Sequence, residues 1–155
     1  MEASDCLCTS MLEGGFTSQY SSTRVLIHLT RQSIELFLKA ALQALGQPTE
    51  RLGHNLNDLF VEYRRNYPEL SFHFEIPARF QVTLDLDLFP KTIDPFHKTL
   101  DQRHRYATDK AGSSFTTPES FDPAAFQEEL GELSRALGIL EWAEIKPFLR
   151  AKNAP

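Results

Sequence analysis

Cysteine is scarce in this sequence, which excludes a disulfide scaffold and the common zinc-binding patterns. The 155 residues include two cysteines, Cys6 and Cys8, with one residue between them. This spacing is too short for an ordinary disulfide and matches neither the paired CxxC nor the Cys–His spacing of zinc proteins. We therefore expect two reduced thiols and no metal site.

Net positive charge and the common catalytic motifs are also missing. With 16 basic and 21 acidic residues the formal net charge is -5, so no global positive field would draw the chain onto nucleic acid. Any contact with nucleic acid must come from a local patch. The sequence has no Gly-rich phosphate loop, no GxSxG, no HExxH and no cysteine paired to a plausible catalytic histidine. A generic hydrolase has no support, and no cofactor is expected.

Long apolar runs are absent as well. Residues 1–5 lack the basic and apolar regions of a signal peptide, and no apolar run approaches the roughly 18 residues that span a bilayer. We expect a cytoplasmic protein without a membrane segment.

The chain does contain abundant helix formers, leucine and phenylalanine. Its length fits one domain with a substantial core and is too short for two comfortable ones. We expect an all-α fold, a single domain over 1–155 with its core at about 15–148.

The longest predicted helix includes residues 24–45. It should start somewhere within residues 17–23, where several Ser and Thr residues could cap it, and end at Gly46 and Pro48. Two neighbouring apolar stripes follow helical spacing. The first consists of Leu26, Leu29, Ser33, Phe37, Ala40 and Ala44, and the second of Ile27, Ile34, Leu38, Leu42 and Leu45. Its polar residues form one narrow line, made up of His28, Gln32, Glu35, Lys39 and Gln43.

Two interpretations of this polar line are open. It is either a solvated edge, with Glu35 and Lys39 as an ion pair worth roughly 0.3 to 0.5 kcal/mol, or part of an enclosed groove. In the second interpretation a ligand or another chain pairs with the two charges.

Three further helices are predicted from their caps. A short helix over residues 1–13 should stop at Gly14 and Gly15. The next is capped by Asn55, has Asp58 in its first turn, and carries the apolar residues Leu56, Leu59, Phe60, Tyr63 and Tyr67. The last opens at Asp122-Pro123 and carries Phe126, Leu130, Leu133, Leu137 and Leu140, with Trp142, Ile145 and Phe148 extending the apolar side past an interruption at Pro147.

The middle of the chain is ambiguous. Apolar residues alternate with polar ones over 71–88, which favours a short β-hairpin. Pro77 could instead open a helix that uses Phe80, Leu84 and Leu88. Residues 90–118 hold many turn formers and should form a long loop.

Three stretches carry a family resemblance when taken together. Residues 33–42 read SIELFLKAAL, residues 53–59 read GHNLNDL, and Arg105 is followed by Tyr106. In this order they resemble three features of HEPN domains, the higher-eukaryote and prokaryote nucleotide-binding family. These are the E-x3-K-A core helix, the G-H-D/N-L-x2-L start of the following helix, and the R-Y of the loop before the last helix.

The resemblance implies an antiparallel bundle of four to five helices, usually a homodimer. Family members include ribonucleases of toxin-antitoxin and defence systems and also non-cleaving nucleotide-binding or scaffolding modules. Catalytic members carry an Arg, four to six residues and then a His near the last helix. The nearest Arg–His pairs here have three, two, seven and no intervening residues (Arg24 and His28, Arg51 and His54, Arg65 and His73, Arg103 and His104), and no His follows Arg105. The resemblance therefore does not establish an enzyme.

The candidate site joins residues from the three motifs. A basic cluster in the long loop suits phosphate contact with base stacking, and its members are Lys91, His97, Lys98, Arg103, His104, Arg105, Tyr106 and Lys110. The alternative is a hydrated loop in which Arg105 folds back to pair with Glu35. His54 precedes a helix N-terminus, where it either contacts an anion, acts as a general base, or holds the loop as part of a cap.

The leading functional hypothesis is a non-catalytic nucleotide- or RNA-binding module. Its binding residues would be Glu35, Lys39, His54, Arg103, His104, Arg105 and Tyr106. One alternative is a metal-independent ribonuclease that uses His54 or His104 as the acid-base group and Arg105 to stabilise the transition-state charge. The other is a purely structural dimer that partners another protein.

Overall fold

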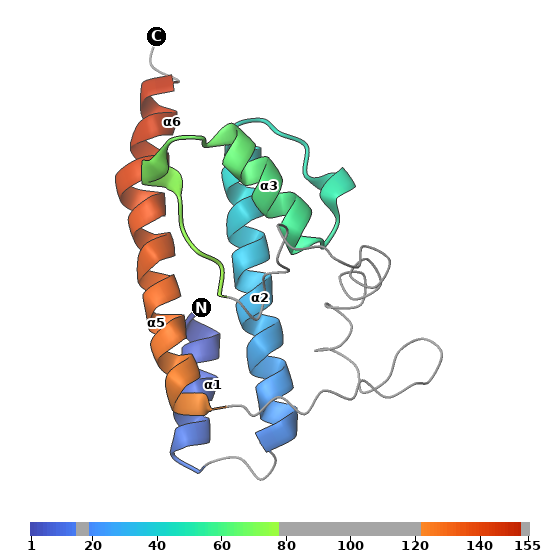
Figure 1. Cartoon of the computed structure of the whole chain (residues 1–155), viewed down its shortest axis with the longest axis vertical. Helices are drawn as coiled ribbons and strands as arrows, with labels where there is room; N and C mark the ends of the chain where they lie inside the picture. The colour runs from blue at the N-terminus through green and yellow to red at the C-terminus, as the bar shows by residue number, and fades with distance from the viewer. Residues whose placement is uncertain (15–18, 78–121, 153–155) are drawn as a thin grey trace, which may run out of the picture. The chain divides into compact units, whose positions relative to one another are not determined.

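The computed structural model describes residues 1–14, 19–77 and 122–152, and every regular element within these ranges is helical (Figure 1). The elements are α1 (Glu2–Leu12), α2 (Gln19–Ala44), η1 (Glu50–Leu52), α3 (Leu56–Asn66), η2 (Leu70–Phe72), α5 (Pro123–Ile139), η5 (Leu140–Ile145) and α6 (Lys146–Lys152). Segments η1 and η2 are single 3-10 turns, and η5 is a π-helical turn. The described residues form an all-α helical bundle, as the sequence predicts. None of their helices has both the length and the apolar character needed to cross a membrane.

The chain divides into two compact units. One comprises residues 1–32 and 82–130, and the other comprises 33–81 and 131–155. Helices α2 and α5 each contribute to both units. The single domain over 1–155 stays a prediction.

In the first unit, α1 packs on the start of α5. Cys8 is fully buried and its Sγ donates to the Pro123 carbonyl at 3.1 Å. Gln127 donates to Thr9 Oγ1 at 2.9 Å. Burial raises the pKa of the Cys8 thiol, and Asp5 adds to the effect. Both cysteines carry free thiols, as predicted.

Helix α2 ends where Gly46 predicts. Gly46 adopts φ +76°, a left-handed conformation that L side chains rarely adopt. The Gln47 N–H donates to the Leu42 carbonyl at 3.1 Å and the Gly46 N–H to the Gln43 carbonyl at 2.8 Å, which is a Schellman cap.

One of the two predicted apolar stripes of α2 forms core. Ile27, Ile34, Leu38 and Leu42 of the second stripe are buried. Burial of the first stripe decreases toward the end of the helix: Leu26 is buried, whereas Ala40 and Ala44 are exposed. Less of the helix circumference is enclosed than its composition suggests.

The second unit is built around tyrosine and phenylalanine side chains. Tyr63 and Tyr67 of the α3 segment are fully buried, with ring centroids 5.0 Å apart. The Tyr63 hydroxyl donates to the Phe72 carbonyl at 2.8 Å, and the Tyr67 hydroxyl donates to the Ala41 carbonyl at 2.9 Å. Burial raises the pKa of Tyr67 to about 12 and also raises that of Tyr63, so both hydroxyls stay protonated and remain donors. These bonds tie α3 to the segment after it and to α2.

The alternating pattern at 71–88 predicts burial correctly but no strand is observed in its described part. Phe72, Phe74 and Ile76 are buried while Glu75 is exposed. Phe72 nevertheless ends the turn η2, and residues 73–77 have no regular secondary structure. Here apolar side chains alternate because an irregular segment packs one side on the aromatic core. Residues 78–88, with the alternative helix after Pro77, lie outside the described ranges.

The last helix begins as predicted, with Asp122 Oδ1 accepting from the Ala124 and Ala125 amides at 2.9 and 3.3 Å. Its predicted core residues Phe126, Leu130, Leu133, Leu137 and Leu140 are buried. Two predictions about its end are wrong: Trp142 is 67% exposed, and Pro147 does not interrupt the helix. A proline ring clashes with the carbonyl four residues earlier in a regular α-helix, and the wider π turn η5 comes just before Pro147.

Candidate functional site

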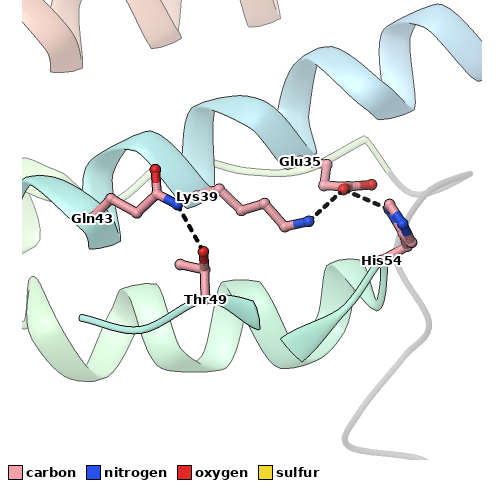
Figure 2. A network of polar contacts seen from close by, with 5 residues as sticks. All are labelled: Glu35, Lys39, Gln43, Thr49 and His54. Carbon is pink, nitrogen blue, oxygen red and sulfur yellow. Dashed lines mark hydrogen bonds and ion pairs between the residues drawn. The ribbon is translucent and has the colours of Figure 1, made fainter. Parts of the chain in front are cut away.

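The Glu35 carboxylate is the meeting point of two of the three sequence motifs. Glu35 Oε1 accepts a hydrogen bond from Lys39 Nζ at 2.8 Å and lies 2.8 Å from His54 Nδ1 (Figure 2). Lys39 is one turn further along α2, whereas His54 comes from the loop before α3. The contact with His54 therefore joins residues 19 positions apart.

Exposure differs sharply across these three side chains. The Glu35 side chain is 7% exposed, that of Lys39 21% and that of His54 69%. The predicted i,i+4 pair is confirmed. Gln32 and Gln43 of the polar line are exposed, as a solvated edge predicts, whereas the Glu35 carboxylate between them is enclosed. Its partners are side chains of the same chain. The arrangement is a buried carboxylate that holds an exposed imidazole in one orientation.

Local backbone geometry brings His54 to Glu35. Gly53 ends the turn η1 with φ +54° and ψ -127°, a conformation that strains any residue with a Cβ. At the other end of the loop, Gln43 Nε2 donates to Thr49 Oγ1 at 3.0 Å (Figure 2). Thr49 is 3% exposed. The loop is thus tied to α2 by one polar contact at each end.

The N-terminus of α3 is satisfied by its own cap. Asn55 Oδ1 accepts from the Asn57 and Asp58 amides at 3.1 and 3.4 Å. Asn55 Nδ2 donates to Asp58 Oδ2 at 2.7 Å. Because the carboxylate of Asp58 already lies in this first turn, the turn is a poor anion site. His54 holds the loop through its contact with Glu35 and at the same time presents its imidazole to solvent.

Opposing effects act on Glu35. Burial raises the pKa of its carboxyl, but the hydrogen bonds and charges of Lys39 and His54 together outweigh burial. The pKa therefore lies below its ordinary value of 4.5. Glu35 is ionised at neutral pH, as its role as a double acceptor requires.

This shift predicts a pH-dependent contribution to stability. A depressed carboxyl pKa gives stability that is present above the ordinary value and is lost as pH falls through the lowered one. We expect the stability difference between wild type and Glu35→Gln to be full at pH 7 and to shrink as pH falls below about 4.5. Urea unfolding followed by circular dichroism at several pH values measures it. A difference that stays constant down to the lowest pH would contradict this assignment.

The other predicted site residues cannot be placed beside this network. Arg103, His104, Arg105 and Tyr106, like the rest of the basic cluster, lie outside the described residues. The predicted site that joins these loop residues to Glu35, Lys39 and His54, and the alternative pairing of Arg105 with Glu35, both stay predictions. Within the described residues, no three His, Cys, Asp or Glu side chains gather in a way that would hold a metal ion.

The sequence did not predict two features of the structure. One is the buried Thr49 beside this site, and the other is a contact between Trp142 and Lys146 away from it. Thr49 was not singled out, because one threonine in a polar loop carries no signal of burial. Trp142 and Lys146 form a second polar–aromatic constellation, with Lys146 Nζ 3.1 Å from the centroid of the Trp142 ring. The helical spacing had suggested that Trp142 belongs to the core.

In comparisons with known proteins, no family model, curated protein or solved structure matches this sequence.

Proposed function

We propose that this chain is a HEPN-like module that binds single-stranded RNA or a nucleotide without cleaving it. The observation that carries the proposal is the meeting of the two motifs at one atom. Glu35 and Lys39 belong to the first motif of the resemblance and His54 to the second, and both partners lie 2.8 Å from Glu35 Oε1. Glu35, Lys39 and His54 are common residues individually, but their contacts join them into one polar network.

The charge distribution suggests what this unit presents to a ligand. The ammonium of Lys39 pairs with an enclosed carboxylate, and the Lys39 side chain is itself only 21% exposed, so Lys39 is a weak candidate for direct phosphate contact. His54 is two-thirds exposed, and Arg51, three residues earlier in the turn η1, is exposed as well. The Arg51 guanidinium is a suitable donor to phosphate oxygens. Since the Nδ1–H of His54 donates to Glu35, His54 donates to a phosphate through Nε2 in the protonated form of the ring. Glu35 then serves to orient His54.

Replacing His54 tests the proposal directly. We expect the affinity for a fluorescein-labelled 12-nucleotide RNA, measured by anisotropy at about 50 mM salt, to fall roughly fivefold in His54→Ala. This factor corresponds to about 1 kcal/mol, the typical net contribution of one hydrogen bond in water. His73→Ala is the matched control, because His73 is a half-buried histidine of the same unit outside the network, and it should bind as wild type does.

The integrity of the RNA distinguishes the proposal from the ribonuclease alternative. The samples are incubated in EDTA, and the recovered RNA is run on a denaturing gel. The carboxylate–imidazole pair of Glu35 and His54 is an arrangement also used for general acid-base catalysis, so this alternative has an observation in its favour. Intact RNA on a denaturing gel is the expected result. Cleavage by wild type that His54→Ala abolishes would make the ribonuclease the better account. If the anisotropy were the same for wild type, His54→Ala and His73→Ala and did not change with salt, RNA binding at this site would be overturned.

A further inference from the structure

Trp142, the one tryptophan of the sequence, lies largely outside the core. It is 67% exposed, whereas tryptophan is usually among the more buried residues of a protein. Its neighbours Glu141 and Ala143 are exposed too. An exposed indole does not gain the free energy that its burial would contribute to folding. The exposure of Trp142 therefore suggests a role other than core packing.

The π turn η5 creates the surroundings of this indole. The Lys146 N–H donates to the Glu141 carbonyl, five residues earlier. The same wide turn lets the Lys146 side chain reach back, so that Nζ lies 2.8 Å from Glu141 Oε1 and 3.1 Å from the Trp142 ring centroid. Turns of this kind occur frequently at functional sites. Here the turn holds the Lys146 ammonium over one face of the largely exposed Trp142 ring.

The chemistry of this arrangement fits a single-stranded nucleic acid. Exposed aromatic rings stack on bases, and an adjacent cation contacts the phosphate that follows. The last turn of α6 adds Arg150 and Lys152, both exposed. Lys146 pairs with Glu141 at an exposed position, where an ion pair is weak enough to open for a phosphate. Arg150 and Lys152 make the last turn of α6 basic, although the whole chain carries a charge of -5.

We propose that Trp142 and Lys146 form a second contact site for single-stranded RNA. One base stacks on the exposed part of the Trp142 indole, and the Lys146 ammonium contacts the adjoining phosphate. The ligand class rests on the proposed function, but the residues are separate from the His54 network.

Two measurements test this site with a 12-nucleotide single-stranded RNA. Binding should quench the tryptophan fluorescence of wild type, which comes from Trp142 alone. By anisotropy, Trp142→Leu should bind roughly five- to tenfold more weakly, because base–aromatic stacking is lost. Trp142→Phe should stay within about twofold of wild type, since it keeps an aromatic face.

Lys146→Gln should lower the slope of log affinity against log salt by about 0.7. Leu70→Ala is the control, since Leu70 is 83% exposed and apolar.

The possible outcomes separate this site from the one at His54. If Trp142→Leu binds as tightly as wild type, the Trp142 site is overturned, while weakened binding by His54→Ala would leave the proposed function standing. The opposite pattern supports the Trp142 site and removes the role of His54. If the protein does not bind RNA at either site, the proposal is overturned. If it also forms a dimer in sedimentation that Trp142→Leu abolishes, Trp142 belongs to a protein interface instead.

Discussion

Replacing Tyr63 by alanine is expected to lower the free energy of unfolding by about 4 kcal/mol, the range for removing a large buried aromatic side chain. The ring is fully buried and lies within 6.4 Å, centroid to centroid, of Phe37, Phe60, Tyr67 and Phe74. Its hydroxyl also supplies the hydrogen bond to the Phe72 carbonyl. The substitution therefore leaves a cavity and an unsatisfied carbonyl at once.

Two further variants separate these contributions. Tyr63→Phe keeps the ring and removes only the hydroxyl, so it should cost about 1 to 2 kcal/mol. Val61→Ala, at a 41% exposed position of the same helix, should stay within about 0.5 kcal/mol of wild type. Urea unfolding followed by circular dichroism measures all three. A loss in Tyr63→Ala no larger than that of Val61→Ala would show that the aromatic cluster does not hold α3 in place.

Replacing Glu35 by glutamine should lower the free energy of unfolding at pH 7 by about 2 kcal/mol. The change removes the charge that accepts from Lys39 and His54, and bonds to charged groups contribute about 1.5 to 3 kcal/mol. The exposure of His54 limits the loss, since its imidazole can return to water.

Glu62→Gln is the matched control for this variant. Glu62 is 14% exposed, and its partners Arg65 and Asn66 lie on the same helix α3. Losing such a local pair costs about 0.5 kcal/mol. If both variants lost the same small amount, Glu35 would be an ordinary helix pair and not the anchor of the loop.

Local signals were enough to predict the helices. Asn55, Asp122 and Gly46 mark helix ends through their own hydrogen bonds or φ angles, which do not depend on distant parts of the chain. The exposure of Trp142 was not predictable in this way, because counting helical steps assumes a regular α-helix and the π turn breaks the count. Likewise, alternation over 71–77 identified the buried side but could not tell a strand from an irregular segment.

The candidate site was predictable in part for the same reason. Glu35 and Lys39 are one helical turn apart, so their contact follows from sequence spacing. The contact of Glu35 with His54 depends on the path of the loop, and thus on the positive φ of Gly53 and the tie between Gln43 and Thr49. Gly53 can be recognised in the sequence as a residue that permits a positive φ, but the sequence does not show that Gln43 pairs with Thr49 or Glu35 with His54.

The measurement that tests the central claim most directly is a double-mutant cycle on RNA affinity with Glu35→Gln, His54→Ala and the combined variant. The claim is that Glu35 acts on the ligand by holding His54. The single variants should then weaken binding by similar factors, and the double variant should be within about twofold of either. Losses that multiply, or an affinity unchanged in Glu35→Gln, would contradict the claim.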